Sequence, residues 1–326
     1  MENQETPTLV IDNGSQRCKG GYAGEDAPHT AFPTVIGRLT SPIPTIDLDY
    51  FVGQAALFKR APMTIKCPIE RGMITDWDDM ERIWHYLYFY ALRIFPDEQP
   101  AVITENPFTP KADREKMIDV FFDTFNVPSF YVGMQSVFSL YASGRTTGIV
   151  LESGEEVSRA VPIYDGYSLR NGISRIDIAG KSVTEYFSKL LKETGYDFTT
   201  NSEREIVREI KERSCFVALD YEKVKKEAEE SSVHDYVYEL PEGNCIYVGN
   251  PRFKAPEILF NPSMIGLEFP GIHELTFGSI MKCDVELRQS LYQNIVVSGG
   301  TTFTSGLPER LSKELASLAP STTKIE

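Results

Sequence analysis

The chain is short of the residues that many metal and redox enzymes use. It has only four histidines and five cysteines among 326 residues. The histidines are scattered and form no H-E-x-x-H motif, and no G-x-G-x-x-G motif follows a predicted strand. The cysteines are odd in number and have neither C-x-x-C nor zinc-ligand spacing, so we expect their thiols to be reduced. Reduced thiols place the protein in the cytosol or nucleus. The sequence therefore gives no support for a zinc enzyme or for a dinucleotide-dependent enzyme.

Long apolar segments and an excess of positive charge are also missing. The uncharged stretches at 124–144 and 289–308 contain too many polar residues to span a bilayer, and the N-terminus lacks the basic and apolar parts of a secretory signal. Forty-seven acidic against 33 basic residues give a net charge of −14, which repels nucleic acid and anionic membranes. We therefore expect a protein that is neither secreted nor integral to a membrane and has no direct contact with nucleic acid.

Two segments of the chain are similar to each other. Residues 10–15 read VIDNGS and residues 150–155 read VLESGE. In each, a short apolar run ends at an acid, Asp12 or Glu152, and a glycine follows, Gly14 or Gly154. Small residues at such a turn let backbone N–H groups approach phosphate oxygens. The acids stand 140 positions apart, as the glycines do. The pattern predicts two similar halves around one cleft that binds a nucleotide and a divalent cation.

The periodicity of apolar residues predicts helices mixed with strands, which is typical of an α/β fold. Short strands are predicted near 9–11, 20–24 and 32–37. Helices are predicted from Asp78, over 110–125, and along an apolar stripe at 183–191 that ends near Gly195. Ser202 and Glu205 predict a capping box at the start of the next helix. Residues 39–50, rich in proline and polar side chains, predict an exposed loop.

Long blocks of the chain resemble actin and the actin-related proteins, from about Thr8 to Ile325. In chain order the blocks are DNGS and CK at 12–19, PIE at 68–70, WDDME at 77–81, REKM at 114–117, LYASGRTTG at 140–148, SIMKCD at 279–284 and SGGTT at 298–302. The resemblance implies a two-lobed α/β actin-like ATPase fold, with ATP and Mg²⁺ in the cleft between the lobes, and filament assembly. The implied lobes are residues 1–137, including the loop 39–50, and residues 138–326.

The resemblance also implies which residues bind the nucleotide. Asp12 and Glu152 would hold Mg²⁺ through its waters, and Gln135 would orient the attacking water. The residues implied to contact the phosphates are Gly14, Ser15, Gln16 and Lys19 on one side and Gly154, Glu155, Glu156 and Val157 on the other. The residues implied to frame the nucleoside are Gly180, Lys211 and Glu212, with Gly300, Thr301, Phe303 and Lys313 on the opposite wall. Without the resemblance, Phe303 is equally well explained as a core residue. Lys211 and Glu212 would then belong to a solvated helix face.

The chain departs from the family at several of these positions. Gln16 stands where the family usually has glycine. The second turn has Glu152, Glu155 and Glu156 where actins carry aspartates and a glycine. Arg159 stands where actins place a histidine near the attacking water, and arginine cannot act as a base near neutral pH. ATP binding is therefore expected more firmly than hydrolysis, and a slow ATP hydrolase is left open.

Two functions remain open. The first is a cytoskeletal protein of the cytoplasm that assembles with itself or with actin and contacts actin-binding proteins. The second is a non-polymerising subunit of a larger complex, in cytoplasm or nucleus, that uses ATP structurally. The apolar segment 260–267 is either a filament contact or part of the core. The match ends at residues 324–326 without the segment that in actins crosses back to the first lobe, so we expect marginal stability without a partner.

Overall fold

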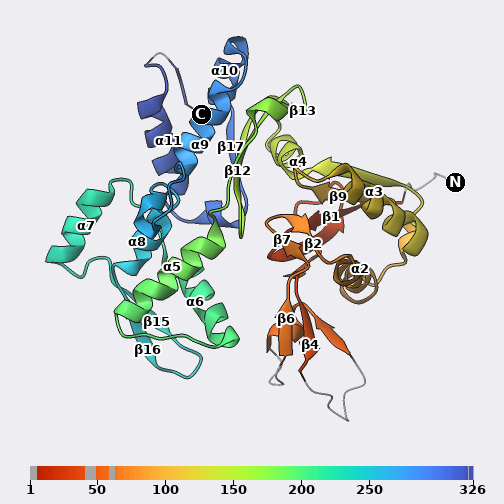
Figure 1. Ribbon diagram of the computed structural model, residues 1–326, viewed down its shortest axis with the longest axis horizontal. Coiled ribbons are helices and arrows are strands. Elements are labelled where there is room, and N and C mark those ends of the chain that lie inside the picture. The colour runs from red at the N-terminus through yellow and green to blue at the C-terminus, as the bar shows by residue number, and fades with distance from the viewer. Residues whose placement is uncertain (1–5, 41–48, 59–62, 322, 326) are drawn as a thin grey trace. The chain divides into compact units, whose positions relative to one another are not determined.

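The computed structural model describes residues 6–40, 49–58, 63–321 and 323–325; of Asn201 and Ser202 it describes the backbone only. The chain divides into two compact units, Met1–Phe138 and Ser139–Glu326, and each is described by itself. Both units combine sheets with helices (Figure 1), which confirms the predicted α/β class.

Unit 1 is built on a five-stranded mixed sheet of order β10-β9-β1-β2-β3. Its central strand β1 (Leu9–Asn13) pairs in parallel with β9 (Ala101–Glu105) and antiparallel with β2 (Arg17–Tyr22). The outer strands are β10 (Phe130–Met134) and β3 (Thr30–Pro33). Leu9 and Ile11 are fully buried, as alternate residues of a strand with one face in the core should be. The turn after Asn13 therefore lies at one end of this sheet, beside the carboxyl end of β9.

The smaller sheets of unit 1 follow β3. β4 (Ile36–Leu39) lies between β5 (Tyr50–Val52) and β6 (Met63–Lys66), while β7 (Ile69–Glu70) pairs with β8 (Met73–Ile74). The strand predicted over 32–37 is thus split between β3 and β4. Thr34 at the break bonds to the loop between β1 and β2 instead of to a strand. The predicted loop 39–50 begins and ends in strands, and its residues 41–48 lie outside the described part of the chain.

The helices of unit 1 confirm two predictions. α2 (Trp77–Tyr86) continues into a π-helical turn, η1 (Leu87–Leu92), and the predicted apolar face is fully buried at Ile83, Trp84, Leu87 and Tyr88. The predicted helix 110–125 consists of α3 (Lys111–Asp119) and a second π-helical turn, η3 (Val120–Thr124). The remaining elements of unit 1 are α1 (Gln54–Phe58) and η2 (Pro96–Glu98). The helix α4 (Gln135–Ala142) starts directly after β10, and the boundary between the two units falls within it.

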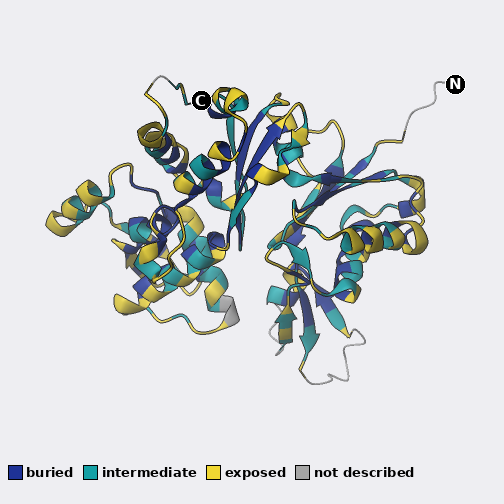
Figure 2. Cartoon of the chain, turned by 45° about the horizontal axis from the view of Figure 1, so that its top comes forward, coloured by how far each residue is buried: buried dark blue, intermediate teal, exposed yellow. Residues whose placement is uncertain are grey.

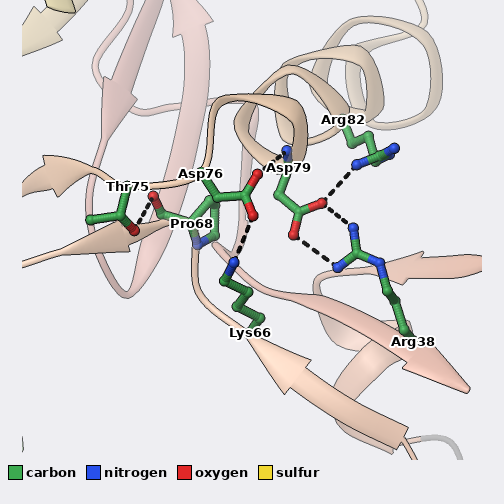
Figure 3. A network of polar contacts seen from close by, with 7 residues as sticks. All are labelled: Arg38, Lys66, Pro68, Thr75, Asp76, Asp79 and Arg82. Carbon is green, nitrogen blue, oxygen red and sulfur yellow. Dashed lines mark hydrogen bonds and ion pairs between the residues drawn. The ribbon is translucent and has the colours of Figure 1, made fainter. Parts of the chain in front are cut away.

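A network of charged side chains fixes the start of α2 against β4 and β6 (Figure 3). Asp76 caps the helix by accepting a bond from Asp79 N at 3.1 Å, and its other oxygen accepts one from Lys66 Nζ at 2.6 Å. The Asp79 carboxylate is fully buried and accepts bonds from Arg38 NH1 at 2.9 Å and Arg82 NH1 at 2.8 Å. Two cations thus satisfy one buried anion.

Unit 2 repeats the central arrangement of unit 1. Its sheet has the order β13-β12-β11-β17, with β14 also on β12. β11 (Gly148–Ser153) pairs in parallel with β17 (Ile295–Ser298) and antiparallel with β12 (Ser158–Tyr164), as β1 does with β9 and β2. β13 (Tyr167–Ser168) and β14 (Ser174–Ile176) both pair with β12 at one edge of the sheet, and β17 forms the opposite edge. Nearly all of β11 and β12 is buried, in contrast to the exposed helix α7 (Figure 2).

Helices pack around this sheet in unit 2. They are α5 (Gly180–Glu193), α6 (Asn201–Ser214), α7 (Tyr221–Glu230), α8 (Pro251–Glu257), α9 (Ile272–Met281), α10 (Val285–Tyr292) and α11 (Leu307–Leu318). Shorter elements are η4 (Arg170–Gly172), η5 (Pro262–Ile265), η6 (Gly300–Phe303) and the hairpin of β15 (Tyr236–Glu239) and β16 (Cys245–Val248). The stripe predicted over 183–191 is the buried face of α5, and Gly195 follows it with a φ of +98°.

The predicted capping box at Ser202 and Glu205 is wrong. α6 starts two residues earlier, and Thr200 Oγ1 accepts a bond from Glu203 N at 3.2 Å. Glu203 Oε2 accepts the Thr200 N–H in return at 2.7 Å. Thr200 and Glu203 have the same spacing as Ser202 and Glu205, so the capping pattern occurs twice in the sequence. The first copy forms the box at the helix start, and the Ser202 side chain lies outside the described part of the chain.

The apolar segment 260–267 contacts the core of unit 2 through some of its side chains, and half of its residues are exposed. Phe260 is buried, and Met264 and Ile265 pack against the main apolar cluster. Leu267 alone among the large side chains of this segment is exposed. In the part of the chain that the structure describes, no helix combines the length and the apolar character needed to cross a bilayer.

Candidate functional site

Two β-hairpins, one in each unit, have the same register. In the first, Asp12 lies opposite Lys19; in the second, Glu152 lies opposite Arg159. Each residue of the second pair follows its equivalent in the first pair by 140 positions. Both hairpins have loops of four residues, 14–17 and 154–157. The repeat of acid and glycine seen in the sequence therefore extends to a basic residue across each hairpin. The sequence contained this signal, because Lys19 and Arg159 also stand 140 positions apart.

The loop of the first hairpin is bonded through its carbonyl oxygens. Thr34 Oγ1 donates to Gly14 O at 2.8 Å, Cys67 Sγ to Ser15 O at 3.1 Å, and Thr34 N to Gln16 O at 3.0 Å. Within the described residues, the N–H groups of Ser15 and Gln16 donate to no protein oxygen. Successive N–H groups of this kind form a nest that an anion can satisfy. The predicted phosphate residues Gly14, Ser15 and Gln16 are thus together in one loop.

The loop of the second hairpin is bonded in the same way. Gly180 N and Thr301 Oγ1 donate to Gly154 O at 3.0 and 2.6 Å, and Lys181 N donates to Glu155 O at 2.6 Å. The Glu155 N–H has no acceptor among the residues that the structure describes. These bonds bring predicted phosphate and nucleoside residues into direct contact. The Val157 carbonyl closes the turn by accepting the Gly154 N–H at 3.2 Å.

The Asp12 carboxylate has three donors around it. Lys19 Nζ lies 3.0 Å from Oδ2, while Thr104 Oγ1 and Gln135 Nε2 lie 2.8 and 2.9 Å from Oδ1. Because an ionised carboxylate only accepts bonds, Gln135 must present its NH₂ group to Asp12. The other end of that amide, Oε1, accepts no bond from the described residues and is open to a water. The Asp12 side chain is 31% exposed and can meet a hydrated cation.

The Glu152 carboxylate is more enclosed. Its Oε2 lies 3.8 Å from Arg159 NH1, and the two side chains are 12% and 8% exposed. Burial lowers the pKa of Arg159, and the Glu152 charge opposes that effect. On the next strand, Arg175 lies opposite Arg159 and donates to Asp177 Oδ1 at 2.8 Å. Glu152 therefore already faces a cation of its own protein.

Glu155 and Lys211 lie near enough for the charge of each to affect the pKa of the other. Burial raises the pKa of Glu155 and lowers the pKa of Lys211, while the attraction between the two charges opposes both shifts. Lys211 Nζ also lies 3.3 Å from Gly180 O. Lys211 is thus not part of a solvated face, whereas the Glu212 side chain is 52% exposed. Glu156 in turn pairs with Lys181 Nζ at 3.0 Å.

The residues predicted on the opposite nucleoside wall differ in their surroundings. Thr301 contacts the second loop, and Gly300 and Phe303 belong to the same short helix η6. Phe303 is 89% exposed, so its alternative interpretation as a core residue is wrong. Lys313 Nζ donates to the Leu219 carbonyl at 2.8 Å, and its role at the nucleoside stays a prediction.

Two of the glycines are not required by the packing of the chain itself. At Gly154 and at Gly300, no atom of the described residues lies within 4 Å of the place where a Cβ would stand, and neither glycine has a positive φ. Gly180 differs, because a Cβ there would lie 2.7 Å from Thr301 Oγ1. Open glycines beside a loop of N–H groups fit the close approach of a ligand to the backbone.

The carboxylates fit a cation that keeps its waters. No group of three or more His, Cys, Asp or Glu side chains among the described residues could hold a metal ion by itself. Asp12 and Glu152 are single hard oxygen ligands in separate hairpins, and Mg²⁺ commonly binds through one or two carboxylates together with waters and phosphates. The donor set therefore suits Mg²⁺ and does not suit a fully protein-ligated metal.

Comparison with known proteins shows similarity over nearly the whole chain. The sequence profile of the Actin family matches residues 3–326. An actin-like protein of Neurospora crassa is 46% identical over 327 residues, which cover 98% of this chain and 86% of the relative. Both matches include the two hairpins and the segments that surround them.

Proposed function

This chain belongs to the actin family, whose members generally bind a nucleotide with a divalent cation, and we propose that it binds ATP with Mg²⁺. The observation that carries the proposal is the matched pair of hairpins. In both loops the carbonyl oxygens are bonded within their own unit, while the N–H groups of Ser15, Gln16 and Glu155 have no acceptor in the described chain. A triphosphate supplies such acceptors.

Most of the predicted residues have a role in this proposal. The two loops donate backbone N–H groups to phosphate oxygens, and Lys19 adds a positive charge. Asp12 and Glu152 bind the waters of Mg²⁺, which neutralises phosphate charge when bound. Gly180 and Lys211 border the nucleoside, with Glu212 toward solvent. The exposed Phe303 ring is free to stack on a base.

Alanine substitutions at the open glycines test the proposal. Gly154→Ala and Gly300→Ala add a methyl group where the chain has room, so thermal stability should be retained. The methyl group should displace a phosphate or a nucleoside that lies against the backbone, and ATP affinity should fall at least about tenfold, since a misplacement near 1 Å has effects of this order or more. Isothermal titration calorimetry with Mg-ATP measures it.

Gly278→Ala provides the matched control. Gly278 lies in α9, also with no described atom within 4 Å of its Cβ position, and it has no predicted role in binding. Its substitution should leave ATP affinity unchanged. Equal affinity in all four proteins would contradict the proposed site, and absence of binding to the folded wild-type chain would contradict ATP binding altogether.

For the cellular role, we propose that the protein takes part in filament assembly, with itself or with actin, and thereby contacts actin-binding proteins of the cytoskeleton. Membership of the actin family and 46% identity to an actin-like protein support this role. Sedimentation at high speed with and without Mg-ATP, alone and with purified actin, tests it. Protein that stays in the supernatant in every mixture would refute the proposal.

One observation favours a second candidate, a non-polymerising subunit that uses ATP structurally. Arg159 lies buried against Glu152 at a position where actins have a histidine, and a guanidinium cannot accept a proton near neutral pH. Tight ATP binding without phosphate release and without pelleting, together with recovery of a stable complex from cells, would favour this candidate over filament assembly.

A further inference from the structure

The two hairpins carry equivalent ion pairs in different surroundings. Lys19 and Asp12 are 47% and 31% exposed, so water and salt screen their charges. Arg159 and Glu152 are 8% and 12% exposed, and their interaction is screened far less. The second hairpin therefore holds a fixed positive charge beside its predicted metal-binding carboxylate.

We propose that Arg159 is a built-in counter-ion at the phosphate site, so that ATP binding by this protein depends only weakly on a divalent cation. This inference rests on the proposed function, because it concerns the same ATP site. It assigns Arg159 a part in ligand binding instead of the proton transfer that its position suggests.

The argument follows from the charge on each partner. A guanidinium stays ionised at any physiological pH, so Glu152 always has a cation 3.8 Å away. That cation reduces the attraction of Glu152 for a second cation, a metal. It also cancels the repulsion between Glu152 and a triphosphate, which in its absence the metal would have to offset.

The charges around the pair do not change this result. Arg175, the neighbour of Arg159 across β12 and β14, is balanced by Asp177. The two further glutamates of the loop are each opposed by a lysine, Glu156 by Lys181 and Glu155 by Lys211. A loop with three glutamates is therefore close to neutral before any metal binds, which explains how it can accept a triphosphate.

The test compares four full-length proteins: wild type, Arg159→Gln, the double variant Glu152→Gln/Arg159→Gln, and Arg175→Gln. ATP dissociation constants are measured by calorimetry in EDTA and in Mg²⁺. The affinity of the protein–ATP complex for Mn²⁺ is measured by electron paramagnetic resonance. Neither measurement depends on hydrolysis.

The inference predicts opposite changes for the two ligands. Arg159→Gln removes the cation beside Glu152, so ATP in EDTA should bind about tenfold more weakly, and Mn²⁺ should bind more tightly. Changes of this size are expected for two charges roughly 4 Å apart in a partly buried site. The double variant is again neutral. It should regain ATP affinity in EDTA to within about threefold of wild type and bind Mn²⁺ more weakly than Arg159→Gln, as expected for coupled charges.

Arg175→Gln is the matched control, since it removes the same charge one strand farther from Glu152. It should change ATP affinity in EDTA by less than about threefold. Equal effects of Arg159→Gln and Arg175→Gln, or a wild-type protein that binds ATP only with a divalent cation, would overturn the inference while leaving ATP binding intact. If Arg159→Gln does not fold, the double variant decides by its ATP affinity in EDTA, which should stay within about threefold of wild type; a larger loss would overturn the inference. Folded wild-type protein that binds no ATP in either buffer would refute the proposed function itself.

Discussion

Gln135 Nε2 lies 2.9 Å from Asp12 Oδ1, so the first residue of α4 is bonded to a residue 123 positions earlier, near the end of β1. The same nitrogen lies 3.4 Å from Thr104 Oγ1, which itself donates to Asp12. The amide plane is thereby fixed, and its carbonyl oxygen points away from the carboxylate. A fixed acceptor of this kind can orient a water molecule.

Gln135→Ala should therefore slow phosphate release more than it weakens ATP binding. We expect the single-turnover rate to fall at least about tenfold, because orientation of a reacting water is lost, while the ATP dissociation constant changes less than about threefold. Rapid-quench measurement of phosphate with a parallel calorimetric titration checks both values. An unchanged rate, or a wild-type protein that releases no phosphate, would remove Gln135 from catalysis.

Removal of the buried Asp79 carboxylate should destabilise unit 1. Asp79→Ala leaves Arg38 and Arg82 without their anion, but both guanidiniums are about 40% exposed and can be rehydrated. We therefore expect a loss of about 2 to 3 kcal/mol, below the usual range for broken buried pairs. Arg82→Ala should cost less than about 1 kcal/mol, because Arg38 remains. Urea unfolding followed by tryptophan fluorescence measures both; equal losses would contradict the arrangement in Figure 3.

The start of α2 should weaken in acid. The bond from Lys66 holds the pKa of Asp76 below its ordinary 3.8, and the bond from the Asp79 N–H adds to this effect. Because the folded pKa is the lower one, the stabilisation is present above pH 3.8 and is lost as the pH falls through the folded value. Between pH 6 and pH 2, the urea midpoint of the wild-type protein should fall more steeply than that of Asp76→Ser, because the stabilisation by Asp76 is lost only in the wild type. Serine still caps the helix but does not titrate in this range; identical slopes for the two proteins would refute the prediction.

The sequence was sufficient where neighbouring residues decide the structure. The apolar face of α2 and the stripe of α5 follow from the 3.6-residue period, and the strand with its acid and glycine appears directly at 10–15 and 150–155. These features predicted the α/β class and the two turns, because each depends on side chains within one element.

Contacts between distant segments could not be predicted in this way. Lys211 follows a helical pattern that fits a solvated face, yet its Nζ lies 3.3 Å from Gly180 O, 31 positions earlier in the chain, and burial lowers its pKa although the charge of Glu155 opposes that shift. Phe303 is a large apolar residue of a type that is usually buried, but it lies exposed in η6. Both outcomes depend on tertiary packing, which residue type and spacing do not encode alone.

Thr200→Ala tests the one helix start that local patterning placed wrongly. The Thr200 hydroxyl satisfies the Glu203 N–H, and its loss should reduce the free energy of unfolding by about 1 kcal/mol, the usual value for an N-cap. Thr200→Ser should retain most of that stability, because the hydroxyl is kept. Glu205→Ala is the comparison at the rejected box: Glu205 pairs with Arg208 within α6 and should matter less than Glu203→Ala, which removes the acceptor for two backbone N–H groups. Thermal unfolding of the four variants ranks them, and a larger loss for Glu205→Ala than for Glu203→Ala would move the helix start back to the second copy of the pattern.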